Sequence, residues 1–493
     1  MSYTEEKGRE LCPSVTLSLC EKTLRTETTG DYVLPDYQPE IRRVLHVIPT
    51  VLPPAKYVGN GSVEWNGTVD YQVFYVGADG EMYTLSLSSE YGGSVPMEGA
   101  ERVSLNEGIT VLVTSLCEGV TTRVSGPRRL SIRCRLSARI RAYGALPMET
   151  RETGVQDAST LQRHTLEEES MRLWCDYSDG ILCRDEIEGV GEETRVISAV
   201  AEAVVEGARW EPEGLRAVGE VTVHMLLVET NGKIRPLSRK LPLDGVIEGE
   251  GGNGPCCVRC TVGEIRVQTE EGKLQCEVTV LLEARCAENV PVTFVDDAYA
   301  LDFESECRYV EVPVCHSLGC GTGNFSQSER IPVSEAGLSE GAEVLACFGN
   351  AWFEECRGGE GRYLLSGKSR YVLLCERSGE YFSAEVVRPI RYETEGTEEM
   401  PDGFDAVASV MSCRARLEGE TLCVDTEWAV STEFTGSKTV TGLEEVSLIK
   451  PLSDAGSCMT VYYPSAEDTS WSIAKKYHVS PEDIQENGAY YLF

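Results

Sequence analysis

Histidine is scarce in this sequence, with five residues in a chain of 493. Because histidine is the commonest metal ligand and the usual general base near neutral pH, few sites of either kind can be built. The motifs of common enzymes are absent as well: there is no P-loop, no G-x-S-x-G and no H-E-x-x-H. We therefore expect a protein that is not an enzyme and needs no cofactor.

Basic residues are few relative to acidic ones, 45 against 80, which gives a net charge of −35. Such a surface repels phosphate backbones and anionic lipid, so we expect neither nucleic-acid binding nor membrane docking. No apolar run of about 18 residues exists, which disfavours membrane insertion. Residues 1–7 precede no apolar signal core, and we expect a cytoplasmic location.

Most of the sequence shows the residue patterns of β-strands. Three stretches, 66–91, 218–243 and 365–392, each read as a strand, a tight turn and a second strand. Their turns end at Gly80, Gly232 and Gly379, which lie about 150 residues apart. Glycine supplies the positive φ that short hairpin turns need. The spacing predicts a repeated hairpin.

Further strands recur at the same interval. Apolar residues alternate with polar ones over 130–140, 274–284 and 422–430, which is typical of half-buried strands. We predict a mainly β fold of three repeated, sandwich-like antiparallel β-modules, with linkers near 144–166 and 315–325. The predicted modules are 1–150, with an N-terminal segment leading into it, 165–310 and 325–450. Three unrelated sandwiches of similar size are the alternative.

The end of the chain changes to a helical period. Residues 468–478 place apolar side chains on one helical face, and Ser480 followed by Pro481 predicts the start of a second short helix. Strand patterns flank the helices at 459–463 and 489–493. We predict a small strand–helix–helix–strand domain over 456–493.

This tail resembles a LysM module. The matching positions are Asp468, Thr469, Trp471, Ile473, Ala474, Lys476, Tyr477, Val479, Ile484 and Asn487. Two positions differ, because Glu467 replaces the usual glycine and Ser470 a hydrophobic residue. The resemblance implies a βααβ fold that binds N-acetylglucosamine polymers or, in some members, proteins.

A distinctive string, Y-V-L-P-D-Y-x-P-x-I, occupies 32–41. It resembles the opening segment of an uncharacterised β-module family of spore-forming clostridia, in which repeated modules end in LysM. Its best-known members are spore-coat morphogenesis proteins. The resemblance implies a partner, the coat-basement ATPase, and a place at the forespore surface, in the cytoplasm of the mother cell.

Cysteine is plentiful, with twenty residues. Cys307, Cys315, His316 and Cys320 form a weak candidate zinc site, because three thiols and an imidazole match zinc chemistry. The spacing is loose and no second Cys-x2-Cys pair supports it, so we predict no metal. Cysteines within strand patterns, such as Cys276, are expected to be small buried hydrophobes.

Taken with these patterns, the resemblance implies a non-enzymatic scaffold or adaptor in spore-coat assembly, which binds a morphogenetic protein through the LysM-like tail. The expected partner-binding residues are Asp468, Thr469, Trp471, Lys475, Tyr477 and Asn487. Tryptophan is a frequent interface anchor, and a lysine suits an acidic partner. The alternative is a cell-wall protein that binds peptidoglycan or N-acetylglucosamine. An enzyme with carboxylates paired across a cleft is a third, weaker hypothesis.

Overall fold

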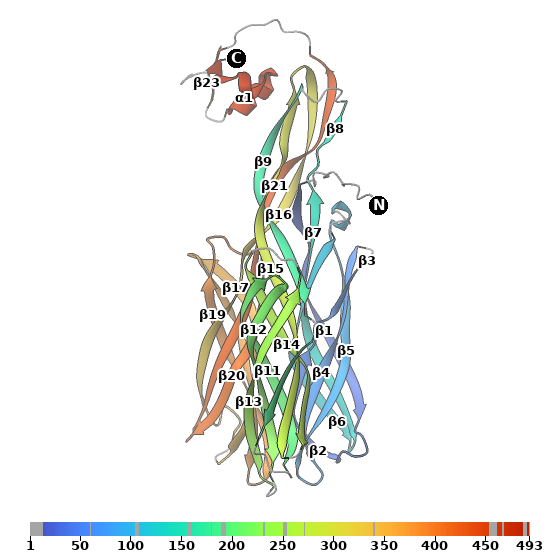
Figure 1. Cartoon of the computed structure of the whole chain (residues 1–493), viewed down its shortest axis with the longest axis vertical. Coiled ribbons are helices and arrows are strands. Elements are labelled where there is room, and N and C mark those ends of the chain that lie inside the picture. The colour runs from blue at the N-terminus through green and yellow to red at the C-terminus, as the bar shows by residue number, and fades with distance from the viewer. Residues whose placement is uncertain are drawn as a thin grey trace.

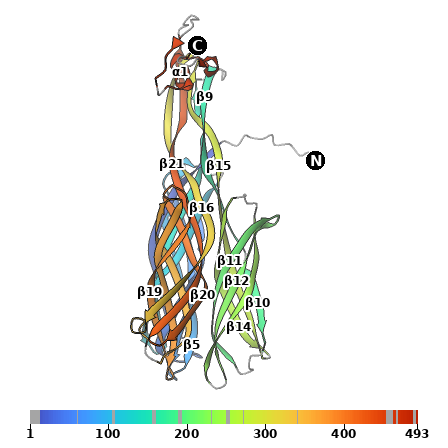
Figure 2. The same cartoon turned by 90° about the vertical axis from the view of Figure 1, so that its left-hand side faces the viewer.

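The chain is mainly β and is built from several antiparallel sheets (Figure 1). The computed structural model describes residues 13–492 apart from 60, 104–107, 155–159, 179, 189–193, 230–231, 250–253, 271, 339–340, 453–460, 466–467 and 487–490. The molecule is elongated: sheets at one end form a broad body, a narrow stalk rises from it, and the C-terminal tail lies at the far end (Figures 1 and 2).

The first part of the chain forms two sheets and a single 3-10 turn. One sheet has the order β1–β7–β6, and in the other β4 pairs with β2, β3 and β5. The elements are β1 (Ser14–Val33), β2 (Ile41–Val51), β3 (Ala55–Gly59), β4 (Ser62–Gly77), β5 (Met82–Pro96), η1 (Ala100–Arg102), β6 (Ile109–Gly126) and β7 (Arg129–Pro147).

The middle of the chain again forms two sheets. One has the order β11–β12–β13, and in the other β15 pairs with β9, β10 and β14. The strands are β8 (Arg151–Thr153), β9 (Leu161–Tyr177), β10 (Ile181–Ile187), β11 (Arg195–Glu211), β12 (Gly214–Val228), β13 (Ile234–Glu248), β14 (Cys256–Glu270) and β15 (Lys273–Ala300).

The last large sheet follows the order β16–β21–β20–β17–β18–β19. The short β8 adds to it by a parallel pairing with β21. Its strands are β16 (Phe303–Pro332), β17 (Glu343–Gly359), β18 (Arg362–Arg377), β19 (Glu380–Glu395), β20 (Gly403–Glu418) and β21 (Thr421–Pro451).

The three predicted hairpins are confirmed: β4 pairs with β5, β12 with β13, and β18 with β19. Their turn glycines, Gly80, Gly232 and Gly379, have φ of 90°, 79° and 78°. This is the left-handed region that glycine enters without steric cost. The alternating strands 130–140, 274–284 and 422–430 are also present, within β7, β15 and β21.

Three large apolar cores lie along the chain. One is built mainly from 15–146, a second from 183–286 and a third from 318–434. A smaller core joins them, because Phe74, Leu226 and Leu374, one from each of the three hairpins, pack in one cluster. The three parts of the body therefore share an apolar centre.

The stalk consists of the ends of four strands that lie toward the tail: the start of β9, the end of β15, the start of β16 and the end of β21 (Figure 2). Next to the body these strands pack into the first core, through Phe294, Val312 and Val440. β9 pairs with β15, and β16 with β21, as two long antiparallel ribbons. Small and branched side chains pack between the ribbons: Leu161, Ala298, Ala300, Leu443 and Val446 are buried together. Figure 2 shows both ribbons running from the body to the tail.

The second predicted linker, 315–325, is wrong, because these residues lie in the middle of β16. Their glycines serve packing and register. A Cβ on Gly323 would collide with the Tyr392 hydroxyl, and Gly319 follows a register shift in the pairing with β21. A Cβ on Gly319 or Gly321 would meet no atom within 4 Å, so crowding applies to Gly323 alone, and the glycine run is part of a continuous strand. The first predicted linker, 144–166, contains β8 and the start of β9.

The described residues of the tail form one α-helix, α1 (Ser470–Tyr477), and a small sheet. The second predicted helix is a single 3-10 turn, η3 (Pro481–Asp483). β24 (Tyr491–Leu492) pairs with both β22 (Val461–Tyr462) and β23 (Gln485–Glu486). No helix among the described residues is long and apolar enough to cross a membrane.

Candidate functional site

The helix α1 starts at a capping box. The Thr469 hydroxyl accepts a hydrogen bond from the Ser472 backbone N–H at 3.1 Å, and Ser472 Oγ accepts one from Thr469 N–H at 2.9 Å. Two backbone donors that the first turn would leave unpaired are thus satisfied. Ile473, 1% exposed, and Ala474 form the buried face, as the amphipathic spacing predicts. The opposite face carries Lys476 into solvent.

Two of the predicted partner-binding residues meet on one carboxylate of the stalk. Trp471 Nε1 donates a hydrogen bond to Asp297 Oδ2 at 2.8 Å, and Lys475 Nζ donates to Asp297 Oδ1. Lys475 Nζ also lies 3.0 Å from the hydroxyl of Tyr309 on β16. Trp471 and Lys475 are four residues apart on α1, so they project from the same side of the helix.

Aromatic rings enclose the same tryptophan. The Trp471 ring lies 5.0 Å from the ring of Tyr299 on β15, in an edge-on arrangement, and 5.1 Å from that of His164 on β9. Centroid distances in this range are typical of favourable aromatic pairs. Four side chains of the stalk, His164, Asp297, Tyr299 and Tyr309, therefore form one receptor for the tail, which we call the stalk patch.

Two further hydrogen bonds fix the end of α1. The Tyr299 hydroxyl donates to the backbone oxygen of Val479 at 2.6 Å. His478 Nδ1 lies 2.8 Å from the backbone oxygen of Ala300, and because a carbonyl only accepts, the ring donates through this nitrogen. His478 has a left-handed backbone with φ of 55°, which ends the helix and turns the chain along the stalk.

The charges at this contact strengthen each other. Burial would raise the pKa of Asp297, but hydrogen bonds from Lys475, Trp471 and Tyr309 outweigh it and hold that pKa below the ordinary value. Burial would lower the pKa of Lys475, but its bonds to Asp297 and Tyr309 raise it. Both groups are therefore charged over the neutral range.

The other predicted tail residues have internal roles. Asp468 accepts hydrogen bonds from the Tyr462 hydroxyl at 2.9 Å and from Ser465 N–H at 2.8 Å, which closes the turn before α1. Thr469 caps the helix. The Tyr477 ring lies 5.7 Å from that of Tyr462, edge-on. Asn487 lies outside the described residues.

The four residues of the candidate zinc set lie on β16 but have separate neighbours. Cys307 Sγ contacts Ala298 O at 3.1 Å, and Cys320 Sγ contacts Arg285 O at 3.5 Å. Cys315 is buried, and His316 Nε2 lies 2.9 Å from a carboxylate oxygen of Glu399. Across the described part of the chain, no three His, Cys, Asp or Glu side chains are placed to hold a metal ion.

A second polar cluster, which the sequence reasoning missed, lies where the three parts of the body meet. Asp405 Oδ2 on β20 accepts hydrogen bonds from Arg141 at 3.1 Å, Arg259 at 2.9 Å and Arg285 at 2.7 Å. Glu433 on β21 pairs with Arg141. We call these five residues the junction cluster. The arginines come from β7, β14 and β15, so the cluster ties different parts of the chain together.

The residues of the junction cluster are buried, and their charges shift one another's pKa. The side chains of Arg285 and Asp405 are 1% and 3% exposed. Burial would raise the pKa of Glu433, but the three arginines lower it to about 2, and they hold the pKa of Asp405 well below its ordinary value. The sequence does contain one sign that these arginines are buried: each has apolar residues or cysteine close by on both sides, as in Cys257-Val258-Arg259-Cys260.

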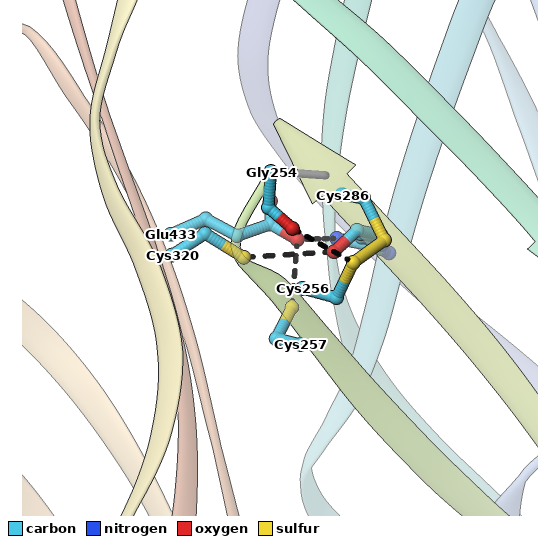
Figure 3. The surroundings of a disulfide bond; sticks show 7 residues. Gly254, Cys256, Cys257, Cys286, Cys320 and Glu433 are labelled. Carbon is cyan, nitrogen blue, oxygen red and sulfur yellow. Dashed lines mark hydrogen bonds and ion pairs between the residues drawn. A yellow bond between two sulfur atoms is a disulfide. The ribbon is translucent and has the colours of Figure 1, made fainter. Parts of the chain in front are cut away.

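Cysteines crowd the edge of the junction cluster, as Figure 3 shows. Cys256 and Cys286 are directly opposite each other on β14 and β15 and form a disulfide. Cys257 Sγ lies 3.2 Å from Glu433 Oε1. The expected buried thiols are confirmed at three strand positions: Cys134, Cys276 and Cys375 are buried and free.

The structure thus offers one predicted site and one unpredicted cluster. The tail face with Trp471 and Lys475 can bind a carboxylate and an aromatic ring, because it already does so on the stalk. The junction cluster is buried and joins different parts of the chain through its ion pairs. Comparison with protein-family models, with curated proteins and with solved structures finds no match for this chain.

Proposed function

We propose that this chain is a non-enzymatic adaptor: a β scaffold that carries a small LysM-like, partner-binding tail at the end of a stalk. One observation carries the proposal. The tail lies at the far end of two ribbons that leave the body, with its small sheet beyond the last strands (Figures 1 and 2). Such a layout serves to present a binding module at a distance from a rigid base.

Repeated irregularities in the second and third parts of the body support a repeated β-module in the proposed scaffold. The β11–β12 pairing shifts register after Val196 and after Val205, and the β17–β18 pairing shifts after Val344 and after Phe353. Corresponding shifts lie about 150 residues apart, the interval of the hairpins. Because bulges depend on local sequence, their recurrence favours repetition of one module over three unrelated sandwiches.

The LysM-like assignment of the tail rests on its order of elements. The order is β22, α1, η3, β23 and β24, so that the helix and the 3-10 turn lie between β22 and β24, which pair, and β23 adds to the same small sheet. A module of this kind binds protein or glycan. The stalk contact favours protein, since Trp471 and Lys475 already bind protein side chains.

The resemblance of the string at 32–41 and of the tail suggests the setting. We propose that the chain acts in spore-envelope assembly, in the mother-cell cytoplasm at the forespore surface, and that the tail binds the coat-basement ATPase. The three β-modules provide reach and lateral contacts, because exposed strand edges pair with other strands. Neither a cofactor nor nucleic acid has a role in this proposal.

The test compares the full chain with a version that ends before Gly456, using the purified coat-basement ATPase as the probe. If the tail binds the partner, the immobilised full chain retains the ATPase and the shortened chain does not. Equal retention by both forms would move the binding site to the body. If neither form retains the ATPase and only the full chain binds insoluble peptidoglycan or chitin, the adaptor proposal is wrong and the chain is a glycan-binding cell-wall protein.

A further inference from the structure

The proposed adaptor requires a free recognition face, but two of its residues are engaged by the chain itself. We propose that the stalk patch imitates the partner: the tail recognises a segment that presents a carboxylate beside an aromatic side chain, and that segment displaces the stalk. This inference rests on the proposed function and names the chemistry of the partner.

The tail binds both oxygens of one stalk carboxylate. Both oxygens of Asp297 are bound by α1, one by the indole N–H of Trp471 at 2.8 Å and the other by the ammonium of Lys475. An indole N–H only donates and an ammonium only donates, so this pair of groups selects an acceptor with two oxygens. A carboxylate matches both, and its charge matches the lysine.

An aromatic side chain of the stalk lies beside this carboxylate and also contacts the tail. The tail meets Tyr299 twice, through the Trp471 ring at 5.0 Å and through Val479 O, which accepts from the Tyr299 hydroxyl at 2.6 Å. Asp297 and Tyr299 are two residues apart on β15, so their side chains project from the same face of the strand. The ligand that the stalk supplies is therefore a short extended segment with the pattern Asp-x-Tyr.

The contact between the tail and the stalk is partly exposed to solvent. Lys475 and Asp297 keep 33% and 21% of their side-chain surfaces exposed, so salt screens this ion pair more than a buried one. Of the two rings that Trp471 contacts, His164 is exposed and Tyr299 is buried, and none of the three large apolar cores includes a described residue of the tail. A partner segment of the same chemistry can exchange with the stalk without disturbing the body.

The experiment uses the peptide Val-Asp-Asp-Ala-Tyr-Ala-Leu, residues 295–301, with a fluorescent label. It is titrated to about 1 mM, the effective concentration of a tethered competitor, onto the full wild-type chain and the full Asp297→Ala variant. Fluorescence anisotropy reports binding. Because Asp297→Ala removes the internal competitor, we expect the variant to bind the peptide at least about tenfold more tightly than the wild type.

Matched controls separate recognition from damage. Asp297→Ala combined with Lys475→Ala must lose the peptide, because the face then lacks its cation. A peptide with asparagine in place of the second aspartate must bind the Asp297→Ala chain more weakly. Glu306→Ala removes an exposed carboxylate from neighbouring β16 and must bind as the wild type does. Thermal unfolding of each variant reports whether the body is intact.

Two results would overturn the inference: equal binding to wild type and Asp297→Ala, or no binding to Asp297→Ala at the highest concentration. Neither depends on the ATPase. A tail that captures the ATPase but ignores the peptide refutes this inference and leaves the adaptor standing. A tail that binds the peptide but not the ATPase supports this inference and refutes the proposed adaptor function.

Discussion

At the scale of single residues, Asp405 is the most constrained charge in the described structure. One of its oxygens accepts hydrogen bonds from three arginines and from the Thr114 hydroxyl at 2.6 Å. These donors come from β6, β7, β14 and β15. A buried ion of this kind adds little stability relative to an apolar core, yet the loss of one member leaves its partners charged and unpaired. Asp405 is thus a point at which separate parts of the chain depend on each other.

We expect Asp405→Asn to lower the free energy of unfolding by about 3–5 kcal/mol, because three buried arginines lose one of the two carboxylates that they share, the other being Glu433. Urea unfolding followed by tryptophan fluorescence measures the loss. Asp425→Asn is the matched control: its carboxylate is 44% exposed and pairs with Arg416 at the surface, so we expect a change within about 1 kcal/mol. Equal effects of the two substitutions would show that the junction cluster is not coupled to folding.

At the scale of elements, the bulges on β11 and β17 each face a glycine. Gly219 lies opposite Val205 and Gly367 opposite Phe353, in each case at the register shift. A Cβ on Gly219 would collide with the carbonyl oxygen of Val204 and lie 2.9 Å from the Cα of Val205. The strands approach so closely there that only glycine fits.

We therefore expect Gly219→Ala to lower the free energy of unfolding by about 1–3 kcal/mol, the usual cost of overpacking a close contact. Gly207→Ala is the control on the facing strand, since its Cβ would meet Val218 Cγ2 at 3.9 Å, an ordinary contact. Chemical denaturation of both variants at one pH gives the comparison. A loss at Gly207 as large as that at Gly219 would contradict the close-approach explanation.

The strands and the tail also show how much of the structure could be predicted from the sequence. Alternation and turn glycines predicted the strands and all three hairpins, because these signals are local. The register shifts and the junction cluster were not predictable, since Arg141 and Asp405 are brought together only by packing between sheets. The same limit applies to the tail. Trp471 and Lys475 were predicted to bind a partner, but Asp297, which binds them here, lies more than 170 residues away in the sequence.

At the scale of the whole molecule, the carboxylates of the junction cluster couple stability to pH. The pKa of Glu433 is about 2 in the folded chain, against an ordinary value of 4.5, and that of Asp405 is also lowered. A lowered carboxyl pKa stabilises the fold at every pH above the unfolded value. This contribution is lost as the pH falls from about 4.5 towards 2.

We accordingly expect the free energy of unfolding to be level with respect to these two groups from pH 7 to about 5 and to fall steeply below pH 4. Denaturant titrations at a series of pH values test this. Asp405→Asn should flatten the acid limb, because the variant lacks one of the titrating groups. An acid limb as steep as that of the wild type would assign the pH dependence to other carboxylates.

The pairing of β16 with β21 has a consequence for the time order of folding. β16 ends at Pro332 and β21 begins at Thr421, and a ribosome needs about 4 to 18 s to synthesise the residues between them. During that interval the edge of β16 has no partner strand. The first core also waits, because Val312 and Val440 belong to it. The core that is built mainly from the first residues synthesised is therefore the last to be completed. A chaperone that covers strand edges would act on this protein before β21 emerges.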